Sequence, residues 1–230
     1  MEKVNRPTIT LTFPIALSII GLVLIPILVL LPKIENFQSY SNQSIIGILF
    51  TAVCFLGVAA ALKPAKCRSI FEKTQNPLPQ TNKVYSVQIK GHHPDCQNYA
   101  GNRIKIRKRV FCAACTGLIV GAIIALVGTI FYFFAGLNLE PGGLWLLALG
   151  EIGVSLGLTQ IWSAGFVKVL LNLVFVVGSF ATLVAVDTIA RSFFVDLYVL
   201  GLILFLLWFR ILLSEWNNRQ ICSKCQLCFH

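Results

Sequence analysis

The sequence contains few charged residues. Only 12% of its 230 residues are Asp, Glu, Lys or Arg, whereas about 25% is typical of a soluble domain. Hydrophobic residues make up 57% of the chain, and the mean hydropathy is +0.79. So little charge in so apolar a chain argues against a soluble domain, and we expect an integral membrane protein.

Acidic residues are scarcer than basic ones. There are 9 Asp and Glu against 19 Lys and Arg, which gives a net charge of +10. In a soluble protein this charge would suggest a nucleic-acid partner. In a membrane protein it is typical of loops that stay in the cytoplasm, so we expect no nucleic acid as a partner.

Several patterns that identify common enzymes are missing. The sequence has no glycine-rich loop with phosphate-binding spacing, no hydrolase triad pattern and no paired carboxylates of an acid–base site. It has neither an N-terminal lipidation motif nor a prenylation motif. No internal repeat or pair of interrupted helices indicates a transporter fold. These absences count against an enzyme, although they do not exclude one.

Six apolar stretches predict an all-α integral membrane protein with about six transmembrane helices, since a bilayer needs about 20 residues per crossing. The first stretch is longer than a signal-peptide core, so we expect it to be retained. In a count of five, the fourth stretch would be re-entrant. The stretches cover residues 9–31, 44–62, 114–136, 144–161, 166–190 and 193–213.

The chain divides into four parts at these stretches. Residues 1–62 hold the first two helices, 63–112 form a basic module with Cys and His, 113–213 hold the other four helices, and 214–230 form a Cys-rich tail. Six crossings place both termini and the basic module on one side of the membrane. The positive-inside rule predicts that this side is the cytoplasm, and hence a multi-pass protein of the cell membrane.

Alternation of apolar and polar residues predicts two strands in the module, over residues 83–90 and 103–109. Turn-forming residues separate them. We therefore expect a small cytoplasmic β-hairpin that carries a zinc-knuckle-like insertion. The second strand would deliver the C-x2-C motif at Cys112 and Cys115 to the membrane surface.

The module contains a possible set of metal ligands. A C-x2-C motif brings two thiolates to one ion, and one imidazole with three thiolates is a common zinc set. Because a reducing compartment disfavours structural disulfides, we expect a metal, with zinc as the first choice. A redox-active dithiol and simple packing of buried cysteines are the alternatives. The candidate ligands are His92, His93, Cys96, Cys112 and Cys115.

The motif Cys-Ala-Ala-Cys-Thr-Gly-Leu-Ile-Val-Gly at residues 112–121 resembles a signature of an uncharacterised membrane family. The family is domain of unknown function 2085, and its signature is C-A-R-C-T-G-x-x-x-G. Ala114 stands where the family usually has Arg, and Cys96-Gln97 matches part of the family's upstream Cys-His-Gln. The resemblance implies a small polytopic membrane protein and no established activity.

The C-terminal tail holds a second group of possible ligands. Cys222, Cys225, Cys228 and His230 suit a second zinc site. The C-x2-C-x2-C spacing also occurs around iron–sulfur clusters, with Cys67 as a possible fourth ligand. Acylation of these cysteines and a reactive tail without metal are the other interpretations. By contrast, Cys54 lies within the second apolar stretch, and we interpret it as a packing residue.

A lone carboxyl group lies in the fourth apolar stretch. Such a group inside a membrane is costly, so Glu151 is a candidate proton or cation site of a small transporter. The alternative is a protonated packing residue that is hydrogen-bonded to Ser155 or Asn172.

Other polar residues lie nearer the ends of the stretches. Lys168 and Asn172 are one turn apart, and Asp187 is four residues before Arg191, which suits an ion pair. We expect Arg210 to extend toward the membrane surface. Small residues four apart, at Gly117 and Gly121 and again at Gly153 and Gly157, predict close helix packing.

Together these features favour an interaction or assembly subunit of a membrane complex, folded around zinc on its cytoplasmic side. The alternatives are a membrane thiol oxidoreductase or electron carrier, and a transporter that depends on Glu151. Expected partners are the bilayer, other membrane subunits, and anionic lipids at the basic residues 103–109.

Overall fold

The computed structural model describes residues 8–31, 40–62, 89–90, 93–94, 97–106, 109–137, 139 and 142–223. Most of them are helical, and six helices are long and apolar enough to cross a membrane. This confirms the predicted number of apolar helices. The helices are α1 (Thr8–Leu30), α2 (Tyr40–Leu62), α4 (Ala113–Thr129), α5 (Gly143–Leu158), α6 (Gly165–Ala190) and α7 (Phe193–Ser223).

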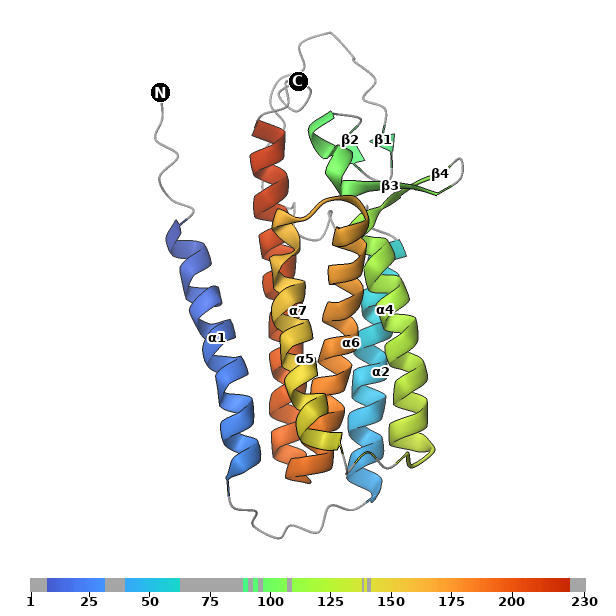
Figure 1. Cartoon of the computed structure of the whole chain (residues 1–230), viewed down its shortest axis with the longest axis vertical. Helices are drawn as coiled ribbons and strands as arrows, with labels where there is room; N and C mark the ends of the chain where they lie inside the picture. Colours follow the sequence, from blue (N-terminus) through green and yellow to red (C-terminus); the bar gives the residue numbers. More distant parts are fainter. Residues whose placement is uncertain are drawn as a thin grey trace, which may run out of the picture.

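The six helices lie side by side along the long axis of the molecule, with α1 at one edge (Figure 1). The central helix is α6, which packs chiefly against α5 and α4. About 61% of its apolar span is buried inside the protein, compared with 28% for α1 and 22% for α2. Most of the bundle therefore forms around α6, and outward-facing apolar side chains cover its surface.

Glycines let α6 approach its two main neighbours closely. A Cβ atom added at Gly117 of α4 would overlap the Val169 carbonyl oxygen of α6. One added at Gly157 of α5 would overlap Phe175, and Gly153 lies against the Gly178 backbone. Helices with small residues at their contact can pack backbone to backbone, so the prediction of close packing at these glycines is confirmed.

With their final turns included, α4 and α5 end within two residues of the sequence prediction, whereas α7 is longer than predicted. α4 continues into a π-helical turn, η2 (Ile130–Phe134), and α5 into a 3-10 turn, η4 (Thr159–Trp162). The span Gly143–Trp162 then has 20 residues, a length that suits a full crossing rather than a re-entrant segment. α7 extends to Ser223, ten residues beyond the predicted end, because residues 214–223 include no Gly or Pro to stop it.

Short strands lie at one end of the bundle, the end at which α7 finishes (Figure 1). β3 (Arg103–Ile106) pairs antiparallel with β4 (Arg109–Cys112), and β1 (Ile89–Lys90) pairs with β2 (His93–Pro94). The 3-10 helix η1 (Gln97–Asn102) connects β2 to β3 in the chain order. We call this the hairpin end of the bundle.

The predicted pairing of residues 83–90 with 103–109 is therefore wrong where the structure describes it. Residues 103–109 are not one strand, because Ile106 is opposite Arg109 in the β3–β4 ladder. Pairing between neighbouring segments closes a shorter loop and so costs less chain entropy. Residues 83–88 and much of the basic stretch lie outside the described residues.

At the opposite end, hydrogen bonds converge on Asp187 of α6. Its Oδ2 accepts hydrogen bonds from Tyr132 Oη at 2.6 Å and from Gln43 Nε2 at 3.0 Å. The Arg191 backbone N–H donates to the Asp187 carbonyl, four residues earlier. Sequence reasoning paired Asp187 with Arg191 and missed Tyr132 and Gln43, which come from helices distant in the chain.

The α4–α6 contact gives a direct test of the packing. We expect Gly117→Ala to lower the free energy of unfolding by about 1–3 kcal/mol, because the new methyl group overlaps the α6 backbone. The control is Gly201→Ala in α7, where an added Cβ meets no atom within 4 Å. Thermal unfolding in detergent measures both, and equal melting temperatures would contradict the close contact.

Candidate functional site

The two cysteines of the C-x2-C motif lie where the hairpin joins the bundle. Cys112 is the last residue of β4, and Cys115 is in the first turn of α4. Neither forms a disulfide, and their side chains are hydrogen-bonded to each other. Thr116 Oγ1 donates a hydrogen bond to the Cys112 carbonyl at 2.9 Å, which holds the strand–helix junction. We call Cys112 and Cys115 the dithiol.

Two buried cations interact electrostatically with the dithiol. Lys168 lies in the first turn of α6 and is 7% exposed; Arg210 lies in α7 and is 4% exposed. Arg210 interacts electrostatically with both thiols, and Lys168 with Cys112. The predicted extension of Arg210 to the membrane surface is therefore wrong, because its side chain points into the protein.

Neutral groups hold both cations in place. Lys168 Nζ donates to Asn102 Oδ1 at 2.5 Å, and Arg210 Nη2 donates to Gln160 Oε1 at 2.9 Å. The Arg210 guanidinium carbon lies 4.9 Å from the centre of the Phe175 ring, a cation–π arrangement. Within the described part of the chain, neither cation forms an ion pair with a carboxylate. The dithiol is therefore where negative charge would best compensate these two cations.

Two buried polar atoms of this site have no hydrogen-bond partner among the described residues. They are Arg210 Nε, a donor, and Asn172 Oδ1, an acceptor. The Asn172 side-chain nitrogen donates to the Lys168 carbonyl one turn earlier in α6. Because a buried polar atom without a partner destabilises a protein, each of these atoms is a place where a ligand could bind.

The close α4–α6 contact brings the start of α4, which carries the dithiol, to the same level of the bundle as the start of α6, which carries Lys168. Gly117, one position after Thr116, lies against Val169 and Asn172 of α6. These two residues follow Lys168 by one and four positions, so the first turns of α4 and α6 lie beside each other. From the other side, Asn102 of η1 reaches Lys168 and joins the hairpin end to the same site.

Two of the five predicted metal ligands of the module lie outside the described residues. The structure places the backbone of His93 in β2, whereas His92, Cys96 and Cys67 are not described. Among the residues that are described, no three His, Cys, Asp or Glu gather to hold a metal ion. The zinc set therefore remains a prediction, with Cys112 and Cys115 as the two members seen side by side.

The predicted ligands of the C-terminal tail are also described only in part. Cys222 falls in the last turn of α7, while Cys225, Cys228 and His230 lie beyond the described residues. The interpretation of residues 214–230 as a separate tail needs correction, because α7 continues through the first ten of them.

Glu151 lies near the middle of α5, as predicted, and is partly buried. Its Oε1 atom has no hydrogen-bond partner among the described residues. Asn172, one of the two partners suggested for it, instead donates to Lys168. A transport role for Glu151 stays a prediction. Cys54 is 6% exposed and packs in the core, which confirms its expected packing role.

Comparisons with known proteins bring no further information to this site, since no family model, curated protein or solved structure was found to match the chain. The functional argument therefore rests on the geometry of the dithiol and its neighbours. Sequence reasoning identified Lys168 and Arg210 only as isolated polar residues. The one clue was their predicted position. Lys168 follows the start of its apolar stretch and Arg210 precedes the end of the next one, and both of these ends were predicted on the cytoplasmic side.

The electrostatic interaction between cations and thiols predicts a change in thiol reactivity. The thiolate is the nucleophile, and a nearby cation stabilises it. We expect Lys168→Gln and Arg210→Gln each to slow alkylation of the dithiol by iodoacetamide about tenfold, which is the effect of 1.4 kcal/mol. Mass spectrometry of the labelled peptides over time measures the rate.

The control for this experiment is Lys105→Gln, since Lys105 is an exposed residue of β3. It removes one positive charge from the hairpin without touching the buried cations. Equal alkylation rates in all three variants and in the wild-type protein would contradict the electrostatic contact.

Proposed function

We propose that this chain is a multi-pass membrane protein whose Cys112 and Cys115 form a dithiol–disulfide redox pair. The observation that carries the proposal is the pair of thiols hydrogen-bonded to each other beside buried Arg210 and Lys168. In this arrangement one cysteine carries the thiolate, the cations stabilise its charge, and the other thiol donates to it. These are the properties of a reactive C-x2-C pair.

The position at a helix start supports the same chemistry. Residues three apart in the first turn of a helix lie on one face, so the two sulfurs are neighbours. The free N–H groups of the first turn of α4 add partial positive charge next to the sulfurs. Exchange with a disulfide such as oxidised glutathione forms the Cys112–Cys115 S–S bond and breaks the S–S bond of the partner. The partner takes two electrons and the one remaining thiol proton, and it leaves as one thiol and one thiolate.

The hairpin end is proposed to face the cytoplasm. An even number of crossings puts the start of α1, the end of α7 and the hairpin on one side, as Figure 1 shows for the bundle. The basic residues of the chain concentrate in the segment between α2 and α4, which suits cytoplasmic retention. In that compartment the dithiol would rest in its reduced form and act as an electron donor.

The redox proposal is tested on the purified full-length protein. After equilibration with mixtures of reduced and oxidised dithiothreitol or glutathione, free thiols are alkylated and mapped by mass spectrometry. We expect a disulfide between Cys112 and Cys115 that forms and disappears reversibly, with a midpoint potential between about −120 and −270 mV. Cys54, buried in the core, stays reduced and is the internal control. A dithiol that remains reduced at every ratio in a folded protein would refute the proposal.

A second candidate function is a structural zinc site that shapes an assembly surface for other membrane subunits. It is favoured by the adjacent thiols, which already form half of a tetrahedral set. It is also favoured by η1, which follows Cys96 directly in the sequence and reaches the site through Asn102. Three thiolates and one imidazole around Zn²⁺ carry a net charge of −1, which two neighbouring cations would accommodate.

Metal analysis of the purified protein separates the two candidates. The zinc candidate predicts about one zinc ion per chain, lost together with folding stability in Cys112→Ser and Cys115→Ser. Iron, with visible absorbance, would instead indicate a cluster at Cys222, Cys225 and Cys228. If the wild-type protein holds less than about half an equivalent of metal, the zinc candidate fails.

A further inference from the structure

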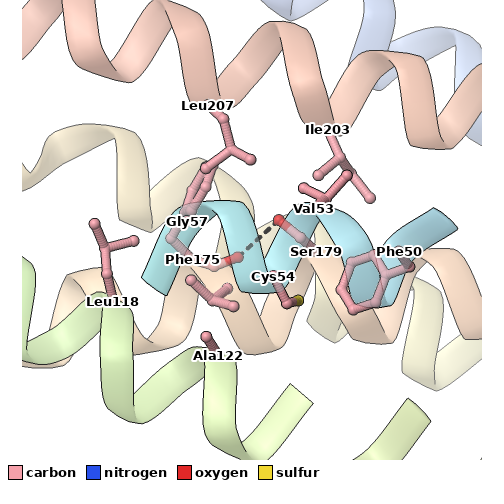
Figure 2. A pocket seen from close by; sticks show the side chains of 11 residues that line it. Phe50, Val53, Cys54, Gly57, Leu118, Ala122, Phe175, Ser179, Ile203 and Leu207 are labelled. Atoms are coloured by element: carbon pink, nitrogen blue, oxygen red, sulfur yellow. Dashed lines mark hydrogen bonds between the residues drawn. The ribbon is translucent and has the colours of Figure 1, made fainter. Parts of the chain in front are cut away.

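Buried hydroxyl groups inside the apolar spans find hydrogen-bond partners within their own helices. Figure 2 shows one of them, the Ser179 hydroxyl, which donates to the Phe175 carbonyl at 2.8 Å beside an apolar pocket. A bond of the same kind, to the carbonyl four residues earlier, satisfies the buried hydroxyl groups of Ser18, Thr129 and Thr182. Glu151 differs from them, because its Oε1 atom is buried without a hydrogen-bond partner among the described residues.

The carboxyl group of Glu151 lies at a depth where the bilayer offers it no partner. It is near the middle of the Gly143–Trp162 span, and the residue is only partly buried. Because an isolated charge in hydrocarbon is costly, a carboxyl group at this depth is neutral. A neutral carboxyl has one O–H donor and a carbonyl acceptor, and lipid tails can pair with neither. A polar partner at the same depth in the membrane would therefore stabilise it.

The helix that carries Glu151 has an outer surface on which such a partner can lie. Among the described helices, α5 packs extensively against α6 alone. The glycines that make this contact, Gly150, Gly153 and Gly157, occupy one side of α5. In Figure 1, α5 passes in front of α7, so its other side is turned away from the rest of the bundle.

The two flanks of this outer surface differ in the middle turns of α5. Ala148 and Ser155 lie three positions before and four positions after Glu151, on the same side of the helix, and both are exposed. The opposite flank holds Leu149 and Leu156, which are 65% and 47% exposed. Small residues let two membrane helices approach closely, whereas large apolar side chains suit contact with lipid tails. The flank of Ala148, Glu151 and Ser155, which we call the Glu151 flank, is therefore the one suited to contact with another helix.

We propose that two copies of this chain associate in the membrane through the Glu151 flank, with the two Glu151 carboxyl groups hydrogen-bonded to each other. Copies that cross the membrane in the same direction place residue 151 at the same depth, and a two-fold axis through the contact brings the two carboxyl groups together. A neutral carboxyl both donates and accepts, so each satisfies the other. The inference uses the proposed membrane placement and does not depend on the redox pair.

A second copy fits this flank better than a lipid or an unrelated helix does. A lipid tail would leave the carboxyl group without a partner. An unrelated helix would need a polar side chain of its own at the depth of residue 151, whereas a second copy supplies one by symmetry. The small side chains of Ala148 and Ser155, one turn away on either side, let the two α5 backbones come close enough for the carboxyl groups to meet.

The experiment measures association of the full-length protein in phospholipid vesicles, by energy transfer between donor-labelled and acceptor-labelled copies over a range of protein-to-lipid ratios. We expect the wild-type protein to form dimers and Glu151→Leu to associate about tenfold more weakly, because the variant lacks the intramembrane hydrogen bond. Glu151→Gln should associate as the wild type does, since its amide also donates and accepts. Leu and Gln are close to Glu in size, so both variants should keep the wild-type helical content, measured by circular dichroism.

Cross-linking tests which flank makes the contact. On oxidation with copper phenanthroline, Ser155→Cys should form a disulfide between copies, above the background from the wild-type protein's own cysteines. Leu156→Cys is the matched control, since the next residue lies at nearly the same depth but is turned about 100° around the helix, and it should stay at that background. Monomers at every protein-to-lipid ratio would overturn the proposal and leave the redox pair untouched. Equal association of Glu151→Leu and the wild type, or equal cross-linking at residues 155 and 156, would also overturn it.

Discussion

Burial of two positive charges is the constraint on which the hairpin end of this protein depends. Lys168 and Arg210 lie inside the bundle, away from water, and the partners described for them are neutral amide oxygens and an aromatic ring. Burying a charge costs several kcal/mol unless opposite charge or hydrogen bonds compensate it. The groups beside them that can carry negative charge are the thiols of Cys112 and Cys115. The redox proposal uses this constraint, because a thiolate there would compensate the cations and be stabilised by them.

Close packing around α6 is what brings these groups together. Glycines on α4 and α5 let the helix backbones touch, and Gly117 in particular fixes the first turn of α4 against Val169 and Asn172. A bulkier residue there would move the dithiol away from Lys168. Helix packing therefore determines the chemistry of the site. The backbone contact at Gly117 fixes how far α4 is shifted along α6, and this shift decides which side chains lie near the dithiol.

The two ends of the bundle differ in their polar chemistry. At the hairpin end, two buried cations interact electrostatically with two thiols. At the opposite end, the carboxylate of Asp187 accepts hydrogen bonds from Tyr132 and Gln43 and joins α6 to η2 and α2. Both clusters include α6, so the central helix carries a cation near its start and a carboxylate near its end.

The amino-acid sequence by itself determined the six apolar helices, because crossing a bilayer imposes a length and a composition that can be read along the chain. It also identified the C-x2-C motif at the start of α4 and the glycine pairs that pack against α6. It did not determine the strand pairing, because alternation of residue type does not say which neighbour a strand selects. Only the tertiary structure placed Lys168, Asn172 and Arg210 beside the dithiol, since they come from helices more than 50 residues away in the chain. Side-chain contacts between distant helices depend on helix rotation and depth, and these are decided by packing rather than by local sequence.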